Sequence, residues 1–195
     1  MSFGNTIFKA ENSLLRHGDK GFSYANRYEV EMGLPTKLAY RFSSNDQSEL
    51  MFRCESISMP GRNLRTVMNG NIYGPPHEIV QGYTFGEVAA SFYSSEDMTE
   101  RTVFEEWQKL AVNQYTYDLN YYKEYTGLVK IFSLNKQDER VYGVELVEAF
   151  PKTVEPIAVG HASSNTINKV GVSFQYRYWK NIQLDTGFGD YSYDF

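Results

Sequence analysis

One segment of the chain carries a helical period, and alternation with period two dominates on both sides of it. Within residues 97–113 apolar residues recur at i, i+1, i+4, i+7 and i+8, which makes one stripe along a helix. The stripe consists of Val103, Phe104, Trp107, Leu110 and Ala111. Asp97 and Glu100 have the spacing of a capping box, and Asn113 is a candidate left-handed cap. The pattern therefore predicts one flanking helix whose stripe, with Val103, Phe104, Trp107 and Leu110, packs against a core.

Alternating residues predict strands before this helix. Residues 26–32 place Tyr28, Val30 and Met32 on one face. Residues 36–48 contain the turn sequence SSNDQS and lead into a second predicted strand over residues 49–58. These two strands would form a first antiparallel pair. A further strand is predicted over residues 83–94, directly before the helix.

After the helix, the alternation predicts a hairpin and one long strand. Residues 128–134 and 140–150 form the hairpin about a turn at residues 135–138, and Phe150-Pro151 ends its second strand. The strand over residues 167–180 alternates Val170, Val172 and Phe174, then Tyr176 and Tyr178, against smaller or polar residues. The tyrosine-rich residues 115–125 have no settled period and receive no assignment.

Residues 60–82 are predicted to form a long, exposed excursion in which turn residues interrupt short strand-like pieces. Asn69-Gly70 is a hairpin signal, because both central residues of a type I′ turn need positive φ. Pro75-Pro76 cannot donate to a strand ladder. Residues 1–25 are predicted to be an N-terminal arm and residues 181–195 a C-terminal tail of a single domain spanning residues 1–195.

Composition and charge exclude several classes of protein. The formal charge of −5 argues against tight binding of DNA or RNA, which depends on clustered Lys and Arg. Cys54 is the single cysteine, so no internal disulfide can form, and its strand position predicts a small buried side chain. No apolar run approaches the ~18 residues that span a bilayer, and no signal-peptide core occurs near the start, so the chain is expected to be made in the cytosol.

The candidate chemistry is sparse, so we expect no enzyme, no metal and no cofactor. The histidines, His17, His77 and His161, lie in loop-like sequence without partners at metal-ligand spacing. Glu105 and Glu106 are adjacent on the predicted helix and therefore point about 100° apart, so one of them is expected on a solvated face and they do not form a carboxylate pair for general acid–base chemistry. The glycines match no phosphate-binding or nucleophile motif.

The chain has 16 Tyr and 13 Phe against 2 Trp, which favours strands and also suits contact surfaces. One helix cannot cover both faces of such a sheet structure, and open strand edges invite pairing with another chain. A ring of identical subunits would satisfy each edge with the next copy. Self-assembly is therefore a physical hypothesis that follows from the predicted elements.

An ordered set of sequence segments resembles the tail tube proteins of contractile-tailed bacteriophages. The segments are NRYEVEMGLP, CESISMPGRNLRT, IYGPPHEIVQGYTFGEVAASFYSSEDMTERTVFEEWQ and VYGVELVEAFPKTVEPIAVGHASSNTINKVGVSFQYRYW. Together they span roughly residues 26–180 in the order of the family. The most specific piece is a strand, then Ser-Glu-Asp, then Arg101, and then Phe104 and Trp107 on the helix.

The resemblance implies a mainly β (α+β) fold: an antiparallel β-sandwich or partly closed barrel with one flanking helix, whose inner sheet neighbouring subunits complete. It implies a structural virion protein, assembled in the host cytoplasm, with six copies in a ring and rings stacked into a tube. DNA passes through the tube without sequence-specific contact. The implied partners are other copies of the chain, a sheath protein outside, a tape-measure protein inside, and baseplate and terminator proteins at the tube ends; no membrane is implied.

By the same resemblance, residues 61–78 of the excursion occupy the position of a loop that reaches the adjacent ring. Its candidate stacking residues are Arg62, Asn63, Arg65, Asn69, Asn71 and Tyr73. Two other functions remain open on the sequence. One is a baseplate protein of the same fold that starts or caps the tube, and the other is a tyrosine-rich β-sandwich that binds carbohydrate by aromatic stacking.

Overall fold

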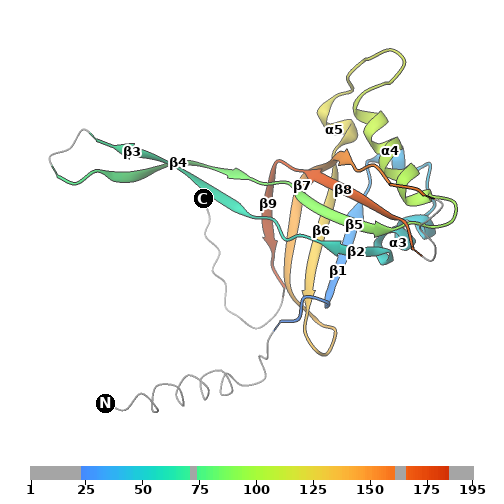
Figure 1. Cartoon of the computed structure of the whole chain (residues 1–195), viewed down its shortest axis with the longest axis horizontal. Helices are drawn as coiled ribbons and strands as arrows, with labels where there is room; N and C mark the ends of the chain where they lie inside the picture. The colour runs from blue at the N-terminus through green and yellow to red at the C-terminus, as the bar shows by residue number, and fades with distance from the viewer. Residues whose placement is uncertain (1–22, 71–73, 161–165, 185–195) are drawn as a thin grey trace.

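The computed structural model describes residues 23–70, 74–160 and 166–184. Most of the predicted arm and tail lies outside these residues. The described chain forms two antiparallel β-sheets that share one strand, four helices at one end, and a two-stranded ribbon that projects from the opposite end (Figure 1). The mainly β fold predicted from the sequence is confirmed, as a pair of packed sheets rather than a closed barrel. Within the described residues, no helix is long and apolar enough to cross a membrane.

The two sheets meet along the longest strand, β7. The first sheet has the order β1-β6-β7-β9 and the second sheet has the order β7-β8-β5-β2, with the N-terminal part of β7 in one and its C-terminal part in the other. The strands are β1 Tyr28–Gly33, β2 Cys54–Ile57, β5 Val88–Tyr93, β6 Gly127–Leu134, β7 Arg140–Val154, β8 Lys169–Gln175 and β9 Tyr178–Ile182. The predicted hairpin of β6 and β7 is present. The predicted first pair is wrong, because β1 pairs with β6 and β2 pairs with β5.

Two segments of the chain pass from one sheet to the other at the shared corner: the strand β7, and the segment that forms β8 and β9. The strand β7 runs through Pro151 to Val154, so the predicted end at Phe150-Pro151 is wrong. It turns at Glu148, whose φ of 56° lies in the left-handed region. The predicted strand over residues 167–180 is divided into β8 and β9, which pair with the two parts of β7 on either side of that turn. Consequently the alternation does not continue through Tyr178, which is exposed while Tyr176 is buried.

The ribbon consists of β3 Arg62–Asn69 and β4 His77–Phe85. These are two regular strands of eight and nine residues, so the prediction of short interrupted pieces is wrong. Asn69 pairs with His77, so the connection spans residues 70–76 instead of a two-residue turn at Asn69-Gly70. The predicted strand over residues 83–94 is divided between the ribbon and β5.

The predicted helix is present as α4, Thr99–Ala111. Three more helices occur in the described chain: α2 Thr36–Ala39, α3 Ser44–Phe52 and α5 Tyr122–Tyr125. The helix α3 replaces the turn and the start of the strand predicted there, because Ser43 and Asp46 form a capping box: the Ser43 hydroxyl accepts from Asp46 N, and Asp46 accepts from Ser43 N. The capping box predicted at Asp97 is wrong, because the N-cap of α4 is Met98, which has a φ of 52° and makes no side-chain cap hydrogen bond.

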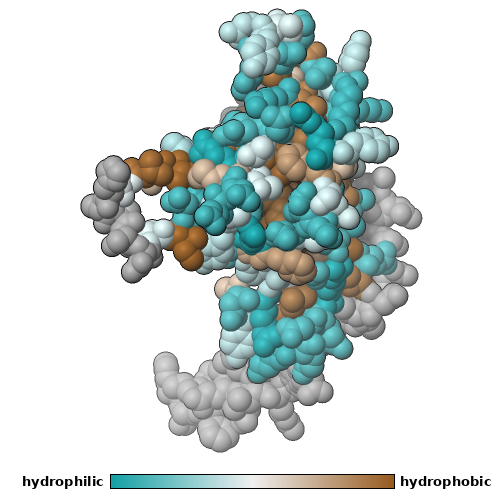
Figure 2. All heavy atoms as spheres, turned by 90° about the vertical axis from the view of Figure 1, so that its right-hand side faces the viewer, coloured by the Kyte–Doolittle hydropathy of each residue, from teal (hydrophilic) through white to brown (hydrophobic). Residues whose placement is uncertain are grey.

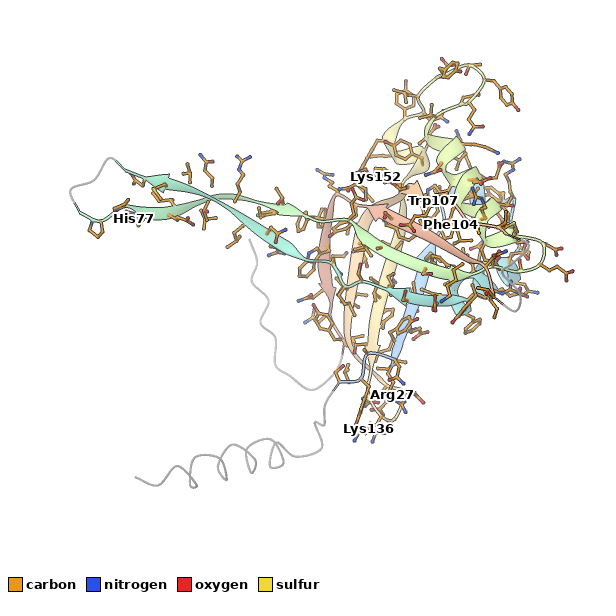
Figure 3. The ribbon with its side chains drawn as sticks, viewed as in Figure 1. Arg27, His77, Phe104, Trp107, Lys136 and Lys152 are labelled. Atoms are coloured by element: carbon orange, nitrogen blue, oxygen red, sulfur yellow. The ribbon has the colours of Figure 1, made fainter. Side chains whose placement is uncertain are left out.

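The core lies between the two sheets and under α4. Val103, Phe104 and Trp107 are buried, and Leu110 packs half-buried against the same cluster. The Phe104 ring lies 5.0 Å from Phe92 and 5.9 Å from Phe174, centroid to centroid. Trp107 Nε1 donates to the carbonyl oxygen of Tyr125 at 2.6 Å, which ties α4 to α5. Figure 3 shows Phe104 and Trp107 between the helix and the sheets.

Candidate assembly surface

The ribbon is a continuation of the second sheet. The pair β2–β5 ends at Ile57 and Ala90, and the pair β3–β4 begins at Arg62 and Phe85, so the same two chain segments run side by side from the core to the tip. Ser58 links the two parts, because its N donates to Ala89 O at 2.9 Å and its hydroxyl accepts from Ala89 N at 2.9 Å. At ~3.3 Å per residue, eight residues carry the ribbon ~26 Å beyond the body.

One face of the ribbon carries an exposed apolar stripe, and the pair Val67 and Ile79 on the opposite face is exposed to a smaller extent. Cross-strand pairing places Leu64 beside Tyr83, and Met68 and Val80 follow on the same face towards the tip. The exposed fractions of these four side chains lie between 55% and 65%. An isolated two-stranded hairpin is only marginally stable in water. Exposed apolar patches commonly mark contact sites, and a second chain that covered this stripe would bury it and stabilise the ribbon.

The base of the ribbon is held on the body by aromatic contacts. The Arg62 guanidinium lies 4.8 Å from the Trp179 ring centroid and 5.6 Å from that of Tyr83. Phe85 packs 5.8 Å from Tyr176 at the edge of the core. These contacts fix the direction in which the ribbon leaves the second sheet.

The structure divides the predicted stacking residues among different roles. Arg62, Asn63, Arg65 and Asn69 are on β3, while Asn71 and Tyr73 lie outside the described residues. Arg62 is engaged at the base, and the other three share the face opposite the apolar stripe. The sequence prediction missed Leu64, Met68, Val80 and Tyr83. Their signal was weak, because the polar Thr66 separates Leu64 from Met68 and the apolar Val67 lies on the opposite face.

The second sheet has two outer strands. In the described structure β2 pairs only with β5, and the C-terminal part of β7 pairs only with β8. Pro151 in β7 is a residue that sheets tolerate at edges. Gln108 of α4 covers one point of this edge, because its amide donates to the carbonyl oxygen of Lys152 at 3.1 Å. The two edges therefore face opposite sides of the sheet and leave main-chain groups for pairing with another chain.

The outward face of the second sheet is built from small residues, and Lys169 on this face is paired with a carboxylate. Small residues pair across β5 and β8, with Ala89 opposite Ser173 and Ser91 opposite Gly171. Lys169 binds Glu55, and the hydrogen bond from Lys169 holds the pKa of that carboxyl below its usual range. The positive charge on this face is thereby compensated by a neighbouring carboxylate.

The described residues hold no cluster of three or more potential metal ligands. His77 lies towards the far end of the ribbon, away from other chemistry (Figure 3). His17 and His161 lie outside the described residues. The end of the molecule opposite the ribbon is mainly hydrophilic, with apolar residues in small separate patches (Figure 2). The surface thus points to assembly contacts on the ribbon and the sheet edges.

A family model of phage tail tube proteins matches residues 23–182. The chain belongs to the phage tail tube protein family. Its matched region includes both sheets, the ribbon and all four helices described above. This family consists of structural tube proteins, which agrees with a surface built for contacts between chains. No curated protein sequence matches this tail tube protein.

Solved structures of contractile injection systems contain chains with the same fold. A chain in the tube-terminating cap of the anti-feeding prophage is 13% identical with a TM-score of 0.61, over 85% of this chain and 93% of that chain. A chain in the sheath–tube complex of the extracellular contractile injection system PVC is 13% identical with a TM-score of 0.59, over 84% and 93%. A chain in the baseplate of the anti-feeding prophage is 15% identical with a TM-score of 0.56, over 85% and 99%.

Proposed function

We propose that this tail tube protein is the repeating tube subunit of a contractile phage tail. Six copies form a ring, rings stack into a tube, and DNA passes through the channel to the host. The observation that carries the proposal is the continuity of the second sheet with the ribbon. A sheet with two open edges can join its neighbours around a ring, and a ribbon that extends the same strands can reach the next ring.

The second sheet is the natural inner wall of this assembly. Pairing of the β2 edge of one subunit with the C-terminal edge of β7 in the next would make a heterologous interface that closes into a ring. The outward face of small residues would then line the channel. Because Lys169 is already bound to Glu55, it offers little attraction to passing phosphates.

The proposed partners are those that the resemblance to tail tube proteins implies. A sheath protein would surround the tube, a tape-measure protein would occupy the channel during assembly, and baseplate and terminator proteins would bind the open ends. The baseplate and cap chains that share the fold favour one alternative, in which this chain starts or caps the tube. An initiator or cap would form single rings that do not extend, whereas a tube subunit would form stacked rings.

Electron microscopy of the purified chain tests the proposal through the two faces of the ribbon. The substitutions Leu64→Ser and Val80→Ser remove partly exposed apolar side chains that stacking would bury, at a cost of ~1–2 kcal/mol each in the stacked state. We expect this variant to form single rings and no long tubes. The matched control carries Asn63→Ser and Thr84→Ser on the opposite face and should form tubes as the unchanged chain does. Normal tubes from the Leu64 and Val80 variant would contradict the stacking role.

A further inference from the structure

The loop that joins α4 to α5 presents large side chains to solvent. Tyr115, Tyr117, Leu119 and Tyr121 are exposed by 79% to 94%. Tyrosine is enriched at protein interfaces, where its rigid ring contributes contact area at a low entropic cost. Burial of three such rings would cover ~450–750 Å², which approaches the ~800 Å² that each partner buries in a standard interface.

The loop is held in one conformation by its own hydrogen bonds. The side-chain oxygen of Asn113 accepts from Tyr115 N at 2.9 Å, and the main-chain oxygen of Asn113 accepts from Tyr117 N at 2.8 Å. Asn120 Nδ2 donates to Leu110 O at 2.7 Å and returns the chain to the end of α4. Tyr117 has a φ of 59°, an unfavourable conformation for a bulky residue. Strain of this kind occurs where the surrounding structure enforces it, often at functional positions.

The loop is adjacent to one of the open edges of the second sheet. It leads into α5, where Tyr122 and Tyr125 pack against Phe150 of β7 at ring distances of 6.5 Å and 5.4 Å. In the last turn of α4, just before the loop, the Gln108 amide donates to the carbonyl oxygen of Lys152. The loop therefore lies beside the C-terminal part of β7, which is the edge that the proposed ring would pair with β2 of the next copy.

A groove lies beside that β2 edge. It has a volume of about 720 Å³ between β1 and β2, and its apolar lining includes Tyr24, Ile57 and Met59. The Tyr28 hydroxyl bridges β1 and β2 by donating to Cys54 O at 2.8 Å. Arg27 also lines the groove and lies at the end of the sheets away from α5 and the tyrosine loop (Figure 3). The loop and the groove thus lie on opposite sides of one subunit.

We propose that Tyr115, Tyr117 and Tyr121 of one copy insert into the groove between β1 and β2 of the next copy in the ring. This inference rests on the proposed function, because the pairing of the β7 and β2 edges brings the loop to the groove. The contact is head to tail, so each copy both donates a loop and accepts one. The apolar lining of the groove suits tyrosine rings, which pack favourably against apolar and aromatic neighbours.

Two variants and their mixture test the contact. The loop variant carries Tyr115→Ser, Tyr117→Ser and Tyr121→Ser, and the groove variant carries Ser56→Trp, which fills the groove from an exposed position of β2. We expect each variant alone to need at least about 100-fold more protein to form rings than the unchanged chain does. The control Tyr40→Ser removes a tyrosine that is 87% exposed elsewhere and should leave ring formation unchanged.

The mixture reports the direction of the contact. The groove variant keeps its loop and the loop variant keeps its groove, so an equal mixture should give dimers and no rings, as measured by mass photometry. Rings formed by the loop variant at the normal concentration would overturn the inference while the ribbon variants still test stacking separately. Rings formed by the groove variant, or a mixture that stays monomeric, would also overturn it. Circular dichroism and unchanged melting temperatures verify that both variants fold.

Discussion

Replacement of Glu100 by glutamine tests how the start of α4 is attached to the sheets. Glu100 is the buried charged residue of the described chain, with an exposed fraction of 3%. Its carboxylate accepts from Ser95 N at 2.8 Å and from the Ser95 hydroxyl at 2.9 Å, and it is bound by the Arg53 guanidinium. These bonds join α4 to the segment after β5 and to the end of α3.

The expected loss of stability follows from the hydrogen-bond and ion-pair partners of Glu100. Hydrogen bonds to a charged group contribute ~1.5–3 kcal/mol and neutral ones ~0.5–1.5 kcal/mol, so loss of the charge weakens each Ser95 bond by ~1 kcal/mol. The Arg53 side chain is 35% exposed, so its ion pair adds no more than ~1 kcal/mol. We expect Glu100→Gln to lower the free energy of unfolding by ~3 kcal/mol at pH 7.

The effect should depend on pH. Burial acts to raise the pKa of Glu100, but the hydrogen bonds from Ser95 and the charge of Arg53 outweigh it, so the pKa is lowered. A lowered pKa stabilises the fold above the unfolded value of ~4.3, and this stability is lost as the pH falls through the folded value. The difference between the unchanged chain and Glu100→Gln should therefore be full at pH 7 and decrease below pH ~4.

Urea unfolding at pH 7 and at acidic pH measures the loss of stability and its dependence on pH. Glu49→Gln is the matched control, because Glu49 binds the same Arg53 at 3.2 Å with a side chain that is 65% exposed. It should change the stability little at either pH. A loss below ~1 kcal/mol for Glu100→Gln at pH 7, or a loss of equal size at both pH values, would refute the reasoning.

Two further predictions concern packing at single positions. An alanine Cβ at Gly127 would lie 2.5 Å from the carbonyl oxygen of Gly33 and 2.7 Å from Trp107, so Gly127→Ala should lower the free energy of unfolding in urea by ~1–3 kcal/mol. The control Gly61→Ala, with nothing within 4 Å of the added Cβ, should change it little. Equal losses for the two variants would contradict the close contact at Gly127. Burial raises the pKa of the Cys54 thiol to about 12. At pH 8 the thiol of the folded chain should therefore react with a thiol reagent on the order of 1,000-fold more slowly than that of the chain unfolded in urea. Similar rates in the two states would show that Cys54 is accessible in the folded chain.

The sequence predicted those elements whose pattern is local. The stripe of α4 and the alternation of β1 each depend on one segment presenting one face, and both periods could be read directly. The β6–β7 hairpin is local as well, because its turn brings neighbouring segments together; Asn135 accepts from Gln137 N at 2.8 Å and Glu139 N at 2.9 Å. The pairing of Tyr28 with Ser133 in β1–β6 joins distant segments, and no local pattern could indicate it.

The helix α3 was missed because its burial is slight. Leu50 is its one fully buried side chain, so its apolar residues trace no stripe, and the segment resembled a turn followed by a strand. The usable signal was the spacing of Ser43 and Asp46, with Asp in place of the usual Glu or Gln. The apolar face of the ribbon was missed for a related reason: both faces are exposed, so Leu64 and Tyr83 are not distinguished by any buried partner face.

A change in the phase of alternation marks the corner where the sheets meet. In β7 the buried residues are Val144 and Leu146 before the turn and Ala149 after it, so the phase shifts by one position at Glu148. In the partner segment, which forms β8 and β9, the residue that faces the core changes from Tyr176, which is buried, to Trp179, which packs against the core three positions later. A one-residue shift moves every following side chain to the other face. Two such shifts on paired strands are therefore what a strand pair needs in order to leave one sheet, enter another and keep the same core covered.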